Sequence, residues 1–161
     1  MRRRTVLVIA GLIALSAAAF AKDSGFAIGA EAASSENFNG WGGRFVFHIP
    51  RVPIYFGIGG FSDSNGFSVD ATADYWFAHN QLSGMLDYYV GLGGYFALAT
   101  GNQSEFALGA RLPIGLQIWP LREGVLEIFL EVAPAWVPIT NSAVSPLTFQ
   151  LQPAIGFRIW F

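Results

Sequence analysis

The charged side chains of this 161-residue chain are scarce and regularly placed. Charged residues make up 12% of the sequence, against about 25% in an ordinary soluble domain. When the chain is divided into strand-length segments, alternate residues point to opposite faces. Nine Asp, Glu and Arg residues inside those segments fall on one face, together with one His. These residues are Glu31, Arg44, His48, Asp70, Asp74, Asp87, Arg111, Glu127, Glu131 and Arg158. Carboxylates and guanidinium groups gathered in this way can form buried ion pairs, line a polar path or act as acids and bases.

Catalysis by these groups lacks an evident nucleophile. A nucleophilic Ser or Cys needs a base within about 2.6 to 3.2 Å, and the chain has no Cys and only 2 His. His48 precedes Ile49 and Pro50 near a strand end, and His79 lies in a predicted turn, so neither forms a local Ser and His motif. Without Cys there is also no thiolate zinc site. The sequence predicts no catalytic residue, metal or cofactor, although separate strands could bring a Ser and a His together.

Eight predicted strands position the charged face. Segments of strand length alternate between apolar residues and small or polar ones, with turn-type residues clustered between them. The predicted strands cover residues 25–33, 41–49, 54–62, 67–77, 85–98, 104–118, 125–138 and 147–161. In the last strand, every second residue from Phe149 to Phe161 is apolar. This period of two predicts an all-β fold.

The composition excludes other classes of protein. The chain is 53% hydrophobic, but its only uninterrupted apolar run lies in the first 21 residues. A bundle of membrane helices, each needing roughly 20 apolar residues, is therefore excluded. The formal net charge is −2, and no basic cluster follows the N-terminus. These two features argue against a nucleic-acid partner.

The N-terminus has the organisation of a secretory signal peptide. Met1–Arg4 is basic, Thr5–Ala18 is apolar, and Ala19–Ala21 supplies small residues at a cleavage-type site. We therefore expect residues 1–21 to be a signal peptide and residues 22–161 to be the exported barrel.

Two barrel architectures use strand alternation in opposite ways. A soluble lipocalin-like barrel turns its apolar face inward, whereas an outer-membrane barrel turns that face toward lipid. Here the apolar face carries the large side chains, and the charged face is otherwise rich in Gly and Ala. Because eight strands enclose little space, the smaller set fits inside. We predict an eight-stranded antiparallel up-and-down transmembrane β-barrel in the cell outer membrane, surrounded by outer-membrane lipid. The alternative is a soluble periplasmic lipocalin-like binding barrel.

The C-terminal strand resembles the signature of bacterial outer-membrane barrels, in which alternate apolar residues lead to a terminal aromatic residue. Phe157, Ile159 and Phe161 form this end, and the resemblance implies that the barrel insertion machinery reads them. The pattern of the whole mature chain resembles the small OmpA-type and OmpX-type barrels. Three segments also look like parts of an uncharacterised family of small bacterial barrels: VPIYFGIGG (52–60), RLPIGLQIWP (111–120) and LEIFLEVAPAW (126–136). The second resemblance implies the same fold and no activity.

The predicted strand order places three acidic residues beside three arginines. The expected pairs are Glu31 with Arg44, Glu131 with Arg111 and Glu127 with Arg158. Three further carboxylates have no expected Arg partner: Asp70, Asp74 and Asp87. We expect at least one of the latter to be protonated, hydrated or paired with His48.

Large side chains on the inward face leave little room for a channel. They are Tyr55, Trp76, Tyr89, Tyr95 and Phe129. The predicted outer connections, residues 34–40, 63–66, 99–103 and 139–146, are too short for a large binding surface. We expect a monomeric barrel with a packed, charge-paired lumen and a structural or envelope-associated role. A narrow solute or ion pore and a binder of small amphiphiles are the alternatives.

Three prolines fall inside predicted strands, where a missing N–H interrupts the hydrogen-bond ladder. They are Pro113, Pro134 and Pro153, in three consecutive segments. We expect bulges or bends at these positions and one weakened wall, suited to a lateral opening or a subunit contact.

Overall fold

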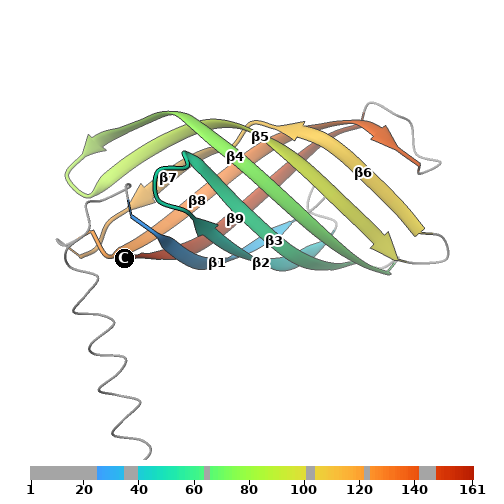
Figure 1. Cartoon of the computed structure of the whole chain (residues 1–161), viewed down its shortest axis with the longest axis horizontal. Helices are drawn as coiled ribbons and strands as arrows, with labels where there is room; N and C mark the ends of the chain where they lie inside the picture. Colours follow the sequence, from blue (N-terminus) through green and yellow to red (C-terminus); the bar gives the residue numbers. More distant parts are fainter. Residues whose placement is uncertain (1–24, 35–39, 64–65, 101–103, 122–123, 142–147) are drawn as a thin grey trace, which may run out of the picture.

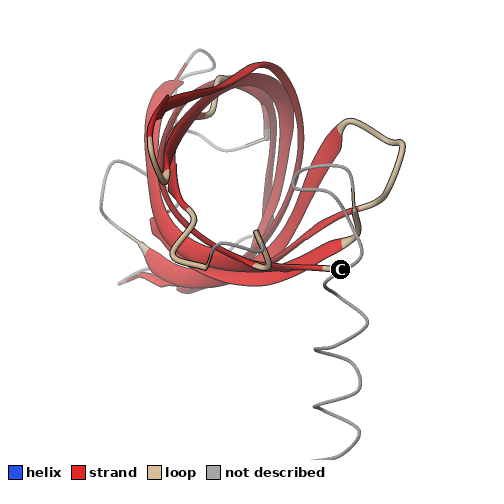
Figure 2. Ribbon diagram, turned by 90° about the vertical axis from the view of Figure 1, so that its left-hand side faces the viewer, coloured by secondary structure: helices blue, strands red, loops and turns tan. Residues whose placement is uncertain are grey.

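The described part of the chain forms a closed antiparallel barrel (Figures 1 and 2). The computed structural model describes residues 25–34, 40–63, 66–100, 104–121, 124–141 and 148–161. Within these residues the strands are β1 (Ala27–Ser34), β2 (Trp41–His48), β3 (Ile54–Asp63), β4 (Gly66–Ser83), β5 (Leu86–Thr100), β6 (Ser104–Arg111), β7 (Ile114–Ile118), β8 (Leu126–Thr140) and β9 (Thr148–Trp160). No helix in this part of the chain is long and apolar enough to cross a membrane.

Each strand pairs with its neighbours around a ring of eight positions. The order runs from β4 through β3, β2, β1 and β9 to β8, and pairing of β4 with β5 closes the ring. β6 and β7 share the position between β8 and β5, because the chain is interrupted at Leu112 and Pro113. The predicted eight-stranded antiparallel barrel is therefore confirmed, with its sixth strand in two parts.

The hairpin of β4 and β5 is longer than predicted. The AHNQLSG segment, expected to be a turn, continues β4 to Ser83 and pairs with β5. Register shifts after Trp76 and after Gln81 accommodate the extension. Gly84 then reverses the chain with φ at 55°, a conformation that favours glycine. His79 consequently lies in a strand and not in a turn.

The apolar face of the barrel points outward. Ile58, Leu130 and Phe149 are 59%, 54% and 63% exposed, whereas the inward-pointing Tyr89 and Phe129 are 0% and 1% exposed. The alternative of a soluble barrel with its apolar face inside is therefore wrong. The predicted inward direction of the aromatic residues Tyr55, Trp76, Tyr89, Tyr95 and Phe129 agrees with their burial, which is complete or nearly so for all but the half-buried Trp76.

The three prolines differ in their effect on strand pairing, although the same effect was expected at each. Pro113 ends the pairing of β6, but Pro134 and Pro153 lie in the continuous register of β8 with β9, so the expectation of a bulge at these two positions is wrong. Pro134 accepts a hydrogen bond from the N–H of Leu112 at 2.9 Å, and Pro113 accepts one from Gly91 at 2.8 Å. In an antiparallel strand the N–H and C=O of one residue point to the same side.

The missing N–H of Pro134 thus faces the break between β6 and β7. A bulge lies nearby, where β6 and β8 change register between Leu108 and Ala110. Pro138, in the facing segment of β8, lies in this bulge. The break and the bulge place the expected weakened wall between β6, β7 and β8, and its weakness stays a prediction, whereas Pro153 lies beyond it.

Two sets of predictions fall at least partly outside the described residues. The predicted signal peptide, residues 1–21, and part of each predicted outer connection are not among them. At the C-terminus, Phe157 and Ile159 point outward from β9. Phe161 exchanges two backbone hydrogen bonds with Phe26, at 3.2 and 2.8 Å. Recognition of these three residues by an insertion machinery stays a prediction.

Candidate functional site: the charged interior of the barrel

All ten residues of the predicted charged face are buried, each at most 8% exposed. They come from β1, β2, β4, β5, β6, β8 and β9 and point into the barrel. Burying a charge is costly unless it is paired and hydrogen-bonded. The contacts of each guanidinium group therefore decide how this interior is arranged.

Arg44 on β2 holds two carboxylates. Its Nη1 donates to Glu31 at 2.7 Å, the expected pair, while its Nε and Nη2 donate to Asp70 at 3.0 and 2.6 Å. The expectation that Asp70 lacks an Arg partner is wrong. Gly59 on β3 stands between Arg44 and Asp70 in the sheet register. A Cβ at Gly59 would lie 3.0 Å from the Asp70 carboxylate and would also meet the stem of Arg44, so glycine lets the arginine cross this strand.

Arg111 on β6 forms a second cluster. It donates from Nη2 to Glu131, the expected partner, and its Nε lies 3.2 Å from Asp74. The prediction that Asp74 has no arginine is also wrong. Here Gly93 separates Asp74 from Arg111 in the register, as Gly59 does in the first cluster.

Two neutral side chains complete the cluster around Arg111. Tyr89 donates its hydroxyl proton to Glu131 at 2.6 Å, and Gln152 accepts from Arg111 at 3.4 Å. The second carboxylate oxygen of Glu131 is therefore bound as well as the first. These neutral partners form hydrogen bonds with the buried charged groups and add no further charge.

Arg158 on β9 combines an ion pair with aromatic contacts. It donates to Glu127, the third expected pair. Its guanidinium carbon lies 3.9 Å from the ring centre of Phe129, 5.2 Å from that of Tyr55 and 5.1 Å from that of Trp76. Cations are attracted to the faces of aromatic rings at such distances. Arg158 therefore links the ionic part of the interior to its aromatic part.

Glu127 itself has two further donors. Gln117 donates from Nε2 at 2.7 Å and Trp160 donates from Nε1 at 2.8 Å. Both lie on the inward face predicted from the strand period, but the charge pattern alone did not select them.

Asp87 is held by an indole and not by His48. Trp119 donates from Nε1 to Asp87 at 2.9 Å, and His79 lies 3.9 Å away on the extended part of β4. The sequence placed both partners in turns and so missed them. The Nδ1 of His48 instead lies 2.9 Å from the carbonyl oxygen of Gly25. The hypothesis that His48 pairs with one of the aspartates is therefore wrong.

An aromatic cluster, consisting of Tyr55, Trp76, Tyr89, Trp119 and Trp160, lies at the end of the barrel where β1 begins and β9 ends. Tyr55 and Trp76 stack with ring centres 3.5 Å apart, and Trp76 and Tyr89 stack at 3.8 Å. Trp160 contacts both Tyr55 and Trp119, at 6.3 and 5.9 Å between ring centres. Side chains from β3, β4, β5 and β9 thus meet across the interior.

The described residues contain no group of three or more His, Asp or Glu side chains suited to a metal ion. The interior instead has paired charges, neutral donors and stacked rings. These contacts hold the strands of the wall to one another across the barrel.

The sequence matches no known protein-family model, and no curated protein sequence matches it significantly. Among solved structures, the crystal structure of Neisserial surface protein A (NspA) is similar, with a TM-score of 0.58 and 17% sequence identity. The match covers 86% of this chain and 98% of NspA. The chain has an NspA-like fold. This is the fold of a small outer-membrane barrel, as the sequence predicts.

Proposed function

We propose that this chain is an integral outer-membrane barrel with a closed interior and a structural or envelope-associated role. An outward wall of large apolar side chains supports the placement in a bilayer. Closure of the ring supports it further, because an open sheet edge in lipid would leave backbone groups without partners. We also propose that it is a monomer and not an enzyme.

The observation that carries the closed interior is the contact of Arg158 with three aromatic rings from β3, β4 and β8. Together with the stack of Tyr55, Trp76 and Tyr89, it spans the barrel from wall to wall. Eight strands enclose just enough space for side chains to fill. Such a layer supports an interior without a continuous water path.

Planar-bilayer recording tests the closed interior. The purified barrel should give no stable conductance steps, whereas a Tyr55→Ala, Trp76→Ala variant should give them because it removes two stacked rings. Stable steps from the unchanged protein would contradict the proposal. The same preparation, incubated with lipid A and separated by thin-layer chromatography, should leave lipid A unmodified.

A narrow cation path is the second candidate function. It is favoured by the excess of carboxylates over guanidinium groups in the interior, where the six buried acidic residues of the charged face stand against three buried arginines. Cation-selective steps from the unchanged protein would favour this candidate over the closed barrel.

Cell fractionation tests the placement. The protein should stay with the membrane fraction and migrate differently on a denaturing gel before and after heating. Release by osmotic shock without detergent would contradict an outer-membrane barrel.

A further inference from the structure

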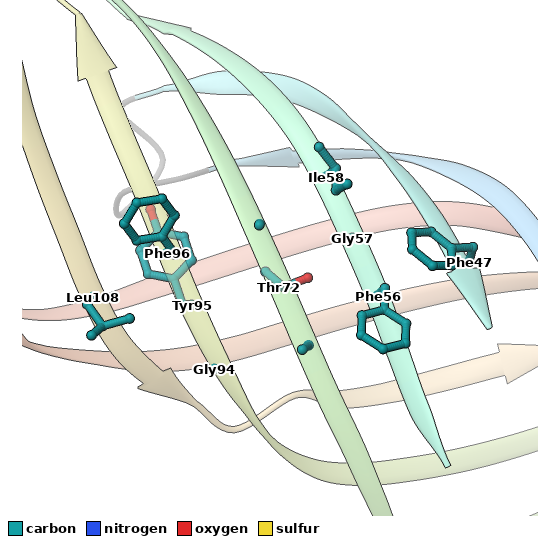
Figure 3. A pocket seen from close by; sticks show the side chains of 11 residues that line it. Phe47, Phe56, Gly57, Ile58, Thr72, Gly94, Tyr95, Phe96 and Leu108 are labelled. Carbon is teal, nitrogen blue, oxygen red and sulfur yellow. The ribbon is translucent and has the colours of Figure 1, made fainter. Parts of the chain in front are cut away.

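An apolar groove of about 360 Å³ lies on the outer wall across β2 to β6 (Figure 3). Small residues form its floor: Ala71, Ala73 and Gly94. Large residues form its sides: Phe47, Phe56 and Ile58 on one side, and Phe96 and Leu108 on the other. The groove is distinct from the charged interior, because it opens on the opposite face of the same strands.

The sheet register explains the shape of the groove. Phe56 pairs with Ala73, which pairs with Gly94, so a large side chain is followed by two small ones. A Cβ added to Gly94 would have no heavy atom within 4 Å, which shows that the space above it is open. Phe47 stacks on Phe56 with ring centres 5.1 Å apart and supports that side.

The lining offers an occupant no hydrogen bond. Thr72 and Tyr95 contribute to the groove, but they are 7% and 3% exposed and their side chains belong to the inward face. An occupant must therefore be apolar. Within a membrane, removal from water gives no advantage, and binding depends on close packing. If the groove were empty, the side chains that line it would lose dispersion contacts. A flexible chain of methylene groups restores these contacts.

We propose that one acyl chain of a membrane phospholipid lies in this groove. The proposal rests on the outer-membrane placement proposed above. A second copy of the barrel would present a broad convex wall, which fits a groove over small residues poorly.

The charge distribution favours a phospholipid over a lipopolysaccharide. Phosphate groups of a lipopolysaccharide would be held by Lys or Arg near the groove. In the described ranges there is no Lys, and three of the four Arg point into the barrel. The fourth, Arg51, lies in the turn between β2 and β3 and does not line the groove. The acyl chain is therefore the part of the lipid that this surface recognises.

Native mass spectrometry of the full-length protein released from phospholipid vesicles tests the proposal. Vesicles of phosphatidylethanolamine and phosphatidylglycerol with identical chains serve as probes. The unchanged protein should retain one phospholipid per barrel, with no preference for either headgroup. Gly94→Leu fills the groove and should weaken retention about tenfold, equivalent to about 1.4 kcal/mol. Ala32→Leu is the matched control, because Ala32 is exposed on β1 outside the groove, and its retention should be unchanged.

Heat-modifiable migration, measured on every variant, separates a failed barrel from a failed lipid site. Equal retention by the unchanged protein and Gly94→Leu would overturn the proposal, as would a headgroup preference or stronger retention of lipopolysaccharide. A dimer that Gly94→Leu dissociates would overturn it in favour of a second copy of the chain.

Discussion

At the scale of single residues, each arginine of the interior contacts more than one acidic or aromatic side chain. Arg44 contacts both Glu31 and Asp70, and each of these side chains is buried. Removing one member of a buried pair leaves the remaining charge without compensation. The arginines should therefore be more sensitive to substitution than the single ion pairs of a protein surface.

Arg44→Met should lower the free energy of unfolding by about 3 to 5 kcal/mol. Urea unfolding in vesicles, followed by tryptophan fluorescence, measures this change. Adding Asp70→Asn should recover part of the loss, because it removes one of the two unpaired carboxylates. Arg51→Met, at an exposed position in the turn between β2 and β3, is the control and should change stability by less than about 0.5 kcal/mol. Equal effects of the two Arg substitutions would contradict the pairing.

Two adjacent glycines on β5 should differ in their response to the same change. A Cβ at Gly93 would lie 2.6 Å from the carbonyl oxygen of Ala73 and would also meet the Asp74 carboxylate, whereas a Cβ at Gly94 meets nothing within 4 Å. Gly93→Ala should therefore cost about 1 to 3 kcal/mol of stability through overpacking. Gly94→Ala should stay within about 0.5 kcal/mol of the unchanged protein. The same urea titration measures both, and a destabilised Gly94→Ala with a neutral Gly93→Ala would mean that the faces are reversed.

At the scale of the strands, we expect the wall to be weakest at the break between β6 and β7. Pro134 cannot return the hydrogen bond that it accepts from Leu112, and Pro113 cannot return the one from Gly91. The carbonyl groups of Leu112 and Gly91 therefore lack the ladder donor that a non-proline residue would supply. This part of the wall should open more readily than the continuous pairing of β8 with β9.

Pro134→Ala should supply the missing donor to Leu112. A net gain of about 1 kcal/mol per hydrogen bond corresponds to about fivefold slower amide exchange at Leu112. Hydrogen exchange followed by NMR in micelles measures this rate. Pro153→Ala, outside the weakened wall, should leave it unchanged, and faster exchange in Pro134→Ala would show that the proline is not the cause.

At the scale of the whole molecule, the period of two explains how much could be predicted from the sequence. Side chains in a strand alternate strictly, so the inward direction of Glu131 and Arg158 follows from counting residues. Contacts between strands depend on register, which counting along one strand does not give. The pairing of Arg44 with Asp70 across Gly59 was therefore missed. The role of Trp119 was missed because it follows β7 in a segment whose composition is typical of a turn.

The central claim is a lipid-facing apolar wall around a closed, charge-paired interior. Methyl NMR of the barrel in vesicles containing phospholipids spin-labelled on the acyl chain tests it most directly. Leu130 and Ile128, which are outward on β8, should be strongly broadened, whereas Val137 and Ala133, which are buried on the same strand, should keep sharp signals. Broadening of Val137 and Ala133 with sharp signals from Leu130 and Ile128 would contradict the account.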